Sequence, residues 1–151
     1  MQEVDNVKCK ITFSDMAGNL EAKYLIQDFC KSANCIVLCY SLTEARSFDD
    51  HADWIKEIDK NPDFKDIPIA LIATKSDLAD TARDVQENQG LRAKRDLGPR
   101  CFLFEEVTTY TDDFDNIKRV RESIINEAKK HWEAYNNVKK EGMLSSTQQN
   151  Y

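Results

Sequence analysis

An unbroken apolar stretch in the middle of the chain, residues 67–73, stops abruptly at a polar cluster that begins with Thr74. A run made almost wholly of Ile, Leu and Ala is typical of a strand that is covered on both faces, as in parallel sheets. A second continuous apolar run, residues 35–42, predicts a central strand of the same kind. Because ligands of open α/β sheets bind beyond the carboxyl ends of the strands, the polar residues from Thr74 onward are the first candidates for a binding site.

The spacing of the other apolar residues predicts two further strands and three helices. Apolar side chains at every second position indicate a half-buried strand over residues 7–14, and a short apolar run indicates another over residues 101–107. Apolar residues on one face predict helices over residues 19–33 and 47–60, and residues 83–97 form a polar segment with a helical pattern that closes at Gly98. Ser47 is the expected N-cap of the middle helix, and Gly90 is expected to interrupt the last one.

The longest periodic signal lies near the C-terminal end of the chain. From residue 116 onward, apolar residues recur every three or four positions, at Ile117, Val120, Ile124, Ala128, Trp132, Tyr135 and Val138. A long helix is therefore predicted. Residues 142–151 are rich in Ser, Thr, Gln and Asn, which is typical of a disordered polar tail.

Strands and helices alternate along the chain. This order predicts an α/β fold, a three-layer and mostly parallel sheet with flanking helices, in one domain over residues 1–141. With 151 residues, of which 41% are hydrophobic, the chain is long enough to bury a sizeable core.

Composition narrows the class of protein. The formal net charge of −6 argues against a nucleic-acid-binding protein. Five cysteines, an odd number, and the lack of a secretory leader favour a reducing, cytoplasmic location. We find no apolar run long enough to span a membrane, and no cysteine near the C-terminus that could carry a prenyl group, so the sequence shows no lipid anchor.

Polar residues follow three of the predicted strands. Asp15 and Gly18 follow the first, Thr74, Lys75 and Asp77 follow the long apolar run, and Thr108 and Thr109 follow the last. A carboxylate such as Asp77 can accept two N–H bonds from a purine edge, and guanine offers an amino group and a ring N–H side by side. Asp15 and Gly18 would suit magnesium or phosphate. Each of these motifs, taken alone, also fits an ordinary turn.

One histidine and three cysteines are weaker candidates for catalysis or metal binding. His51 has no Cys, Ser or His neighbour in sequence, which favours a packing role over catalysis. Cys30, Cys35 and Cys39 match no zinc-binding spacing, which favours buried free thiols.

Taken together and in this order, the segments D-M-A-G at 15–18, T-K-S-D at 74–77 and E-V-T-T at 106–109 resemble the later sequence boxes of Ras-superfamily small GTPases. The resemblance covers about residues 7–135. It implies a G-domain-like fold of the P-loop NTPase class that lacks the first strand, the first helix and the second strand. It also implies the function of that family, a guanine-nucleotide-dependent molecular switch in signal transduction.

The resemblance implies roles for five residues on the base side of a GTP or GDP site. Asp77 would bind the guanine edge, and Lys75 would pack along the base and ribose. Thr74 occupies the position of the family's Asn or Thr before that lysine. Thr108 and Thr109 would lie near the guanine oxygen, although the family's Ser-Ala-Lys loop is only partly matched there.

On the phosphate side, the resemblance implies that Asp15 reaches Mg²⁺ through water and that the Gly18 N–H faces a terminal phosphate. The family usually places Gln after that glycine to orient the attacking water, and this chain has Asn19. The phosphate-cradling motif G-x-x-x-x-G-K-[ST] occurs nowhere among the four glycines of the sequence. We therefore assign no catalytic residue, and we expect the edges of the strands at residues 7–14 and 35–42 to be left unpaired.

Three hypotheses follow. The first is a degenerate, non-hydrolysing pseudoGTPase that acts as a protein-interaction or structural subunit. Its partners would bind to Trp132, Tyr135 and Val138 on the last helix, unless these fold back on the sheet, or to the unpaired sheet edges. The second is a functional GTP-binding and GTP-hydrolysing switch whose phosphate loop is missing from the recorded sequence. The third is a flavodoxin-like or other α/β binding module that shares only loop chemistry with GTPases.

Overall fold

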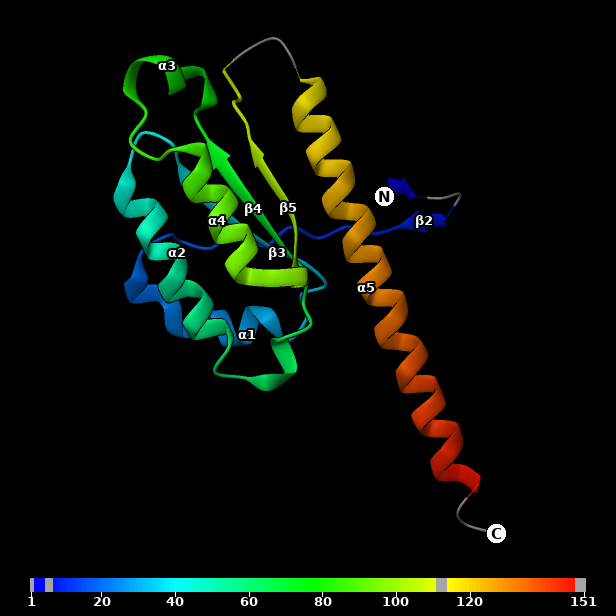
Figure 1. Ribbon diagram of the computed structural model, residues 1–151. Helices are drawn as coiled ribbons and strands as arrows, with labels where there is room; N and C mark the ends of the chain where they lie inside the picture. The colour runs from blue at the N-terminus through cyan, green and yellow to red at the C-terminus, as the bar shows by residue number, and fades with distance from the viewer. Residues whose placement is uncertain (1, 5–6, 111–113, 149–151) are drawn as a thin grey trace.

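The structure is a computed structural model that describes residues 2–4, 7–110 and 114–148. Its elements follow one another in the α/β order expected from the sequence (Figure 1). They are β1 (Gln2–Val4), β2 (Val7–Cys9), η1 (Leu20–Leu25), α1 (Ile26–Cys30), β3 (Ile36–Ser41), α2 (Ala45–Ile58), η2 (Pro62–Phe64), β4 (Ile69–Thr74), η3 (Ser76–Leu78), α3 (Ala79–Ala82), α4 (Glu87–Leu97), η4 (Gly98–Arg100), β5 (Cys101–Glu106) and α5 (Asp115–Gln148).

The described residues form a three-stranded parallel sheet in the order β3-β4-β5. Ile36 of β3 is in register with Ile69 of β4, which is in turn in register with Cys101 of β5. All residues of β4 before Thr74 are buried, as the unbroken apolar run predicts. The prediction that the run at residues 35–42 is a central strand was wrong, because β3 lies at an edge of this sheet.

Helices cover the sheet on both faces, which confirms the predicted α/β class in a small and partial form (Figure 1). Leu71 of β4 packs with Ala93 of α4 on one face, and Ile72 packs with Val120 of α5 on the other. Successive strand residues point to opposite faces, so each face of β4 has its own helices. Each fully buried aliphatic side chain such as Leu71 contributes about 1.5–3 kcal/mol to stability.

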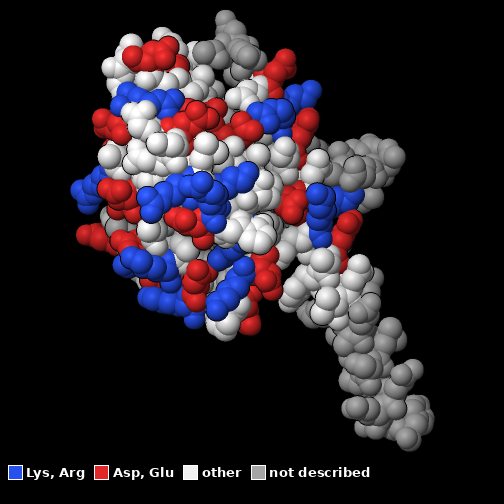
Figure 2. All heavy atoms as spheres, in the orientation of Figure 1, with Lys and Arg blue, Asp and Glu red and all other residues white. Residues whose placement is uncertain are grey.

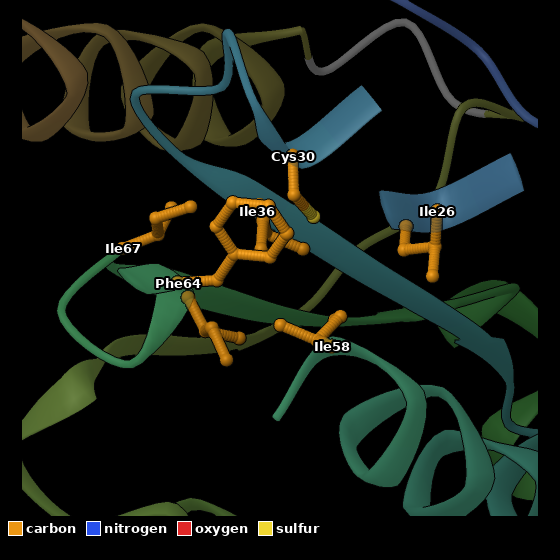
Figure 3. Packing of buried hydrophobic residues seen from close by; sticks show 7 residues of the cluster. Ile26, Cys30, Ile36, Ile58, Phe64 and Ile67 are labelled. Atoms are coloured by element: carbon orange, nitrogen blue, oxygen red, sulfur yellow. The ribbon is translucent and has the colours of Figure 1, made fainter. Parts of the chain in front are cut away.

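One end of the sheet is closed by a separate apolar cluster of seven buried residues, most of which are labelled in Figure 3. They come from α1, β3, α2, η2 and the stretch from Ile67 into the start of β4: Ile26, Cys30, Ile36, Ile58, Phe64, Ile67 and Ile69. Because the cluster joins five segments, it ties the N-terminal part of the domain to the sheet.

Gly90 does not interrupt α4, contrary to the prediction, because the helix runs without a break from Glu87 to Leu97. A Cβ at this position would lie 2.4 Å from Cζ of Phe104 and 2.7 Å from the hydroxyl of Tyr40. The glycine is therefore required by the close approach of α4 to the sheet and not by a turn.

The strand predicted over residues 7–14 is mostly absent. Only Val7–Cys9 forms a strand, and it pairs antiparallel with Gln2–Val4 in a hairpin outside the main sheet. Residues 10–19 have no regular secondary structure. Alternation of apolar residues indicates a strand only where a neighbouring strand is available, and the described residues offer none at that edge of β3.

Several helix boundaries also differ from the predictions. The helix predicted from residue 83 begins at Glu87, and the one predicted over residues 19–33 is a 3-10 helix followed by α1, which ends at Cys30. The middle helix begins at Ala45, so Ser47 lies in its first turn, where the hydroxyl donates to the Glu44 carbonyl at 2.7 Å and accepts from the Ser41 N–H at 2.9 Å. The predicted long terminal helix is confirmed, and it runs past the sheet to Gln148 (Figure 1). The disordered tail predicted from residue 142 is therefore helical as far as Gln148, and residues 149–151 lie outside the described residues.

Candidate functional site

The polar loops after β4 and β5 lie next to each other, as expected for neighbouring parallel strands. The Val107 N–H donates to the Ala73 carbonyl at 2.8 Å, and the Ser76 N–H donates to the Val107 carbonyl at 3.1 Å. Thr74 ends β4, and its hydroxyl donates to the Tyr40 carbonyl at 3.0 Å on the neighbouring strand β3. Backbone bonds therefore hold the two loops in one rigid unit at the carboxyl edge of the sheet.

Lys75 has a left-handed backbone, with φ of 65° and ψ of 38°. This conformation costs a non-glycine residue about 1–2 kcal/mol. The bond from the Leu78 N–H to the Lys75 carbonyl, at 3.0 Å, closes the turn that follows. The strained turn redirects the chain immediately after β4, so that Lys75 and Asp77 both stand exposed at the end of the sheet.

Asp77 is linked to the second loop by a short hydrogen bond. The Thr108 hydroxyl donates to Oδ1 of Asp77 at 2.5 Å, and the same hydroxyl oxygen accepts from the Tyr110 N–H at 3.1 Å. Within the described part of the chain, the other carboxylate oxygen of Asp77 has no hydrogen bond from a protein group. The carboxylate is thus fixed on one side and open to a ligand on the other. Thr109, the next residue after Thr108, is exposed.

An ion pair behind these loops was missed by the sequence analysis. The Arg83 guanidinium donates to both carboxylate oxygens of Glu106, at 2.9 Å and 2.7 Å, and to the Val85 carbonyl at 3.1 Å. Only about a fifth of either side chain is exposed, at 20% and 19%. The hydrogen bond to Glu106 raises the pKa of the Arg83 guanidinium above its usual value. Because Glu106 ends β5, the pair anchors the loop that carries Thr108.

Tyr40 lies beside this ion pair. Its hydroxyl is buried and has no hydrogen-bond partner among the described residues. Burial, with a further contribution from the Glu106 carboxylate, raises the pKa of Tyr40 to about 12. The phenol is therefore neutral at physiological pH, and its ring packs edge-on against Phe48, with 5.0 Å between centroids.

Within the described residues, no hydrogen bond or ion pair joins the phosphate-side residues Asp15 and Gly18 to the base-side loops. Asp15 and Gly18 are exposed, and a Cβ added at Gly18 would meet no atom within 4 Å. The Asp15 carboxylate lies close enough to Cys39 to add to the effect of burial in raising the pKa of that thiol. Asn19 caps the following helix, where its Oδ1 accepts from the Glu21 N–H at 2.8 Å.

The structure gives His51 a packing role and differs in part from the prediction for the cysteines. The His51 ring packs against Phe48 at 4.7 Å between centroids, and Nδ1 contacts the Phe48 carbonyl. Cys30, Cys35 and Cys39 are free thiols, but only Cys30 is buried, so the prediction of buried thiols was wrong for the exposed Cys39.

A cavity of about 290 Å³ lies at the other end of the strands, between the segments that enter β4 and β5 and the middle of α5. Its lining includes Asp66, Arg100, Glu127 and His131. It is therefore separate from the loops that follow the strands. On the face shown in Figure 2, acidic and basic side chains lie interspersed. A search of the described residues finds no helix long and apolar enough to cross a membrane.

The sequence model of the Ras family matches residues 1–130, which is most of the chain. The chain therefore belongs to the Ras family of small GTPases, as the three sequence boxes predict. It is 32% identical over 138 residues to the Ras-like protein rasX of Dictyostelium discoideum, covering 90% of this chain and 61% of rasX. It is 26% identical over 114 residues to the mouse GTP-binding protein Rit1, covering 76% of this chain and 51% of Rit1.

A third relative comes from fission yeast. The GTP-binding protein ypt5 of Schizosaccharomyces pombe is 34% identical over 83 residues, covering 55% of this chain and 39% of ypt5. The chain thus spans between 39% and 61% of the lengths of these relatives.

The described residues fit the two ends of a guanine nucleotide differently. At the base end, a fixed carboxylate with one open oxygen and an exposed lysine stand on one rigid turn, and such a carboxylate can accept N–H bonds from a guanine edge. At the phosphate end, the sequence has no G-x-x-x-x-G-K-[ST] cradle, and Asp15 and Gly18 are exposed. The described residues thus offer a fixed carboxylate acceptor at the base end, and the sequence has no phosphate-loop motif at the other.

Proposed function

We propose that this chain recognises guanine through Asp77 and Lys75 and that the 151-residue form acts as a non-hydrolysing protein-interaction or structural subunit. One observation carries the proposal. A hydrogen bond between Thr108 and Asp77 joins the two base-side loops, whereas no hydrogen bond or ion pair of the described residues joins Asp15 or Gly18 to them.

The base-recognition part of the proposal follows from the chemistry of the open carboxylate. The ring N–H and amino group of guanine can both donate to Asp77, while adenine presents no such pair of donors on its ring edge. The Lys75 stem can lie along the base with its ammonium group in water. Thr74, Thr108 and Thr109 would line the same side of the base, because the loops that carry them are bonded together.

The non-hydrolysing part follows from what the sequence lacks. Phosphoryl transfer depends on a phosphate cradle, a metal ion and a group that orients the attacking water. This sequence has no phosphate-loop motif, and the residue after Gly18 is Asn19, whose side chain caps a helix. We therefore expect guanosine to bind with a dissociation constant of about 40 μM or weaker, since its roughly 20 non-hydrogen atoms at about 0.3 kcal/mol each gain about 6 kcal/mol.

Calorimetric titration with guanosine and adenosine tests base recognition. Asp77→Ala is expected to abolish a weak, guanine-selective signal, because it removes the charged acceptor. Asp80→Ala is the matched control, since Asp80 is an exposed carboxylate on the adjacent α3 and is expected to leave binding unchanged. Equal binding of adenosine, or a signal that survives Asp77→Ala, would contradict the assignment.

The protein-interaction part of the proposal rests on α5. Trp132, Tyr135 and Val138 are 55%, 60% and 70% exposed, so these three side chains do not fold back on the sheet. Exposed aromatic residues on a helix that extends past its domain are typical anchors for a protein partner. Retention of every partner from the native source by the double variant Trp132→Ala, Tyr135→Ala would refute this role.

A second candidate function is a complete GTP-binding and GTP-hydrolysing switch in a longer protein that supplies the phosphate loop. Two observations favour it: the chain spans at most 61% of the relatives' lengths, and its base-side loops are well formed. Native mass spectrometry of the protein from its own source separates the two candidates. A chain heavier than 17.4 kDa that carries GDP and Mg²⁺ would establish the switch, and a 17.4 kDa chain with a protein partner would establish the subunit.

A further inference from the structure

Tyr110 carries the most exposed of the large hydrophobic side chains that the structure describes, at 86%. Covering an aromatic ring is among the larger favourable contributions that one side chain can make to a core or an interface. The ring of Tyr110 contributes little of this kind to the described fold, because it is almost fully open to solvent. It is therefore available to a ligand without the loss of packing inside the domain.

The backbone of Tyr110 is nevertheless held close to Asp77. The Tyr110 N–H donates to the Thr108 hydroxyl oxygen at 3.1 Å, and that hydroxyl donates to Oδ1 of Asp77 at 2.5 Å. Two consecutive hydrogen bonds thus separate the Tyr110 nitrogen from the carboxylate. A tyrosine side chain is longer than this separation, so the ring can reach a base that is bound to the open oxygen of Asp77.

Other apolar surface lies next to the same carboxylate. Leu78, the residue that follows Asp77, is 40% exposed, and the exposed Lys75 on the same turn adds an apolar stem. Small-molecule sites combine hydrophobic and aromatic walls with a few placed polar groups that fix the ligand's orientation. An open carboxylate with a leucine, a lysine stem and a tyrosine on two bonded loops has this composition.

The aromatic ring is particular to this chain. Within the resemblance to small GTPases, Tyr110 occupies the position of the lysine in the family's Ser-Ala-Lys loop. A lysine offers a narrow stem that ends in a charge, whereas a phenol ring offers a flat face on which a nucleic-acid base can stack. The substitution thus replaces a cation at this loop by a stacking surface.

We propose that Tyr110 stacks on the guanine base that Asp77 binds. This inference rests on the proposed function and adds to it the residue that supplies apolar contact with the base. Asp77 selects guanine by accepting its N–H groups, whereas every base has a face on which an aromatic ring can stack. Tyr110 therefore adds affinity without adding selectivity, and this contribution needs no contact with a phosphate.

Calorimetric titration of the 151-residue chain with guanosine tests the stacking. Tyr110→Ala is expected to lower the affinity about fivefold to a hundredfold, as the removal of an aromatic ring from a stacked base does, and Tyr110→Phe should retain most of it. Tyr24→Ala is the matched control, since Tyr24 is 69% exposed on η1, outside the two loops. Equal affinities of the wild type and Tyr110→Ala would overturn the proposal, and so would an equal loss in Tyr110→Phe.

A fluorine label gives a readout that a merely structural role would not move. Incorporation of meta-fluorotyrosine labels all five tyrosines, and the signal that is missing from Tyr110→Phe identifies Tyr110. Guanosine should shift this fluorine signal, because a stacked purine exerts a ring current on the phenol, and it should leave the Tyr24 signal in place. A Tyr110 signal that stays unmoved at saturating guanosine would contradict the stacking.

The outcomes separate the stacking from base recognition itself. Guanosine binding that Asp77→Ala abolishes and Tyr110→Ala leaves unchanged would keep the guanine site and remove Tyr110 from it. A wild-type chain that binds no guanosine at millimolar concentration would overturn base recognition and the stacking together.

Discussion

The Thr108 hydroxyl donates a 2.5 Å hydrogen bond to the Asp77 carboxylate, which joins two loops whose linked residues are 31 positions apart. Thr108→Val keeps the shape of the side chain and removes the donor. We expect guanosine affinity to fall about three- to tenfold, since a net hydrogen bond contributes about 0.5–1.5 kcal/mol and a mobile Asp77 must be ordered on binding. Thr108→Ser keeps the hydroxyl and should retain most of the affinity. Titration calorimetry of the two variants measures the difference, and equal affinities would contradict a positioning role.

The ion pair between Arg83 and Glu106 is expected to stabilise the fold. Arg83→Met removes three hydrogen bonds and leaves a carboxylate that is only 19% exposed without its partner. We expect a loss of about 1–3 kcal/mol in the free energy of unfolding. Urea denaturation measures this loss. The control is Arg92→Met, since Arg92 is 76% exposed and 3.9 Å from Asp96, and exposed pairs contribute little. Equal effects of the two variants would contradict the assignment.

Gly90→Ala tests the close approach of α4 to the sheet. Alanine is the better helix former by about 1 kcal/mol. The added methyl would nevertheless lie 2.4 Å from Phe104, and overpacking costs about 1–3 kcal/mol, so we expect a net destabilisation. Gly18→Ala is the matched control, because a Cβ there meets no atom within 4 Å. A more stable Gly90→Ala variant in thermal unfolding would show that the helix can move away from Phe104.

The stability of the fold is expected to fall in mild acid because of His131. Burial lowers the pKa of His131, and the Asp66 and Glu127 carboxylates only partly oppose this effect. The unfolded chain therefore binds a proton at a higher pH than the folded chain does. The stabilisation that this histidine confers is complete above the unfolded pKa, about 6.5, and is lost as the pH falls from there through the lower folded value. His131→Gln should flatten this part of a stability-against-pH curve measured by urea denaturation, and an unchanged curve would refute the prediction.

The parts of the fold that depend on local pattern could be predicted from the sequence. The apolar run that became β4 identified a strand buried on both faces, and the three-to-four residue rhythm identified α5. Whether β3 is central or at an edge depends on a neighbouring strand, which no local pattern in β3 reveals. The role of Gly90 depends in the same way on Phe104, which lies on a different element.

In the candidate site, too, some contacts could be predicted from the sequence and others could not. Because the carboxyl ends of parallel neighbours meet at one edge of a sheet, the approach of Asp77 and Thr108 could be expected from the strand order. Asp15 was expected at the carboxyl end of a strand in that sheet. Residues 10–19 form no strand, so Asp15 does not lie at a strand end. The pairing of Arg83 with Glu106 had no signal in the sequence, since the two residues lie 23 positions apart and charged residues are usually solvated.

We propose above all that this chain binds the guanine base and that the phosphates of a nucleotide add little to the affinity. Calorimetric titration of the 151-residue chain with guanosine and with GDP, each in the presence of Mg²⁺, tests it most directly. We expect both ligands to bind weakly, with dissociation constants within about threefold of each other, because this chain has no phosphate loop to add contacts to the phosphates of GDP. GDP binding that is a hundredfold or more tighter than guanosine binding would contradict it.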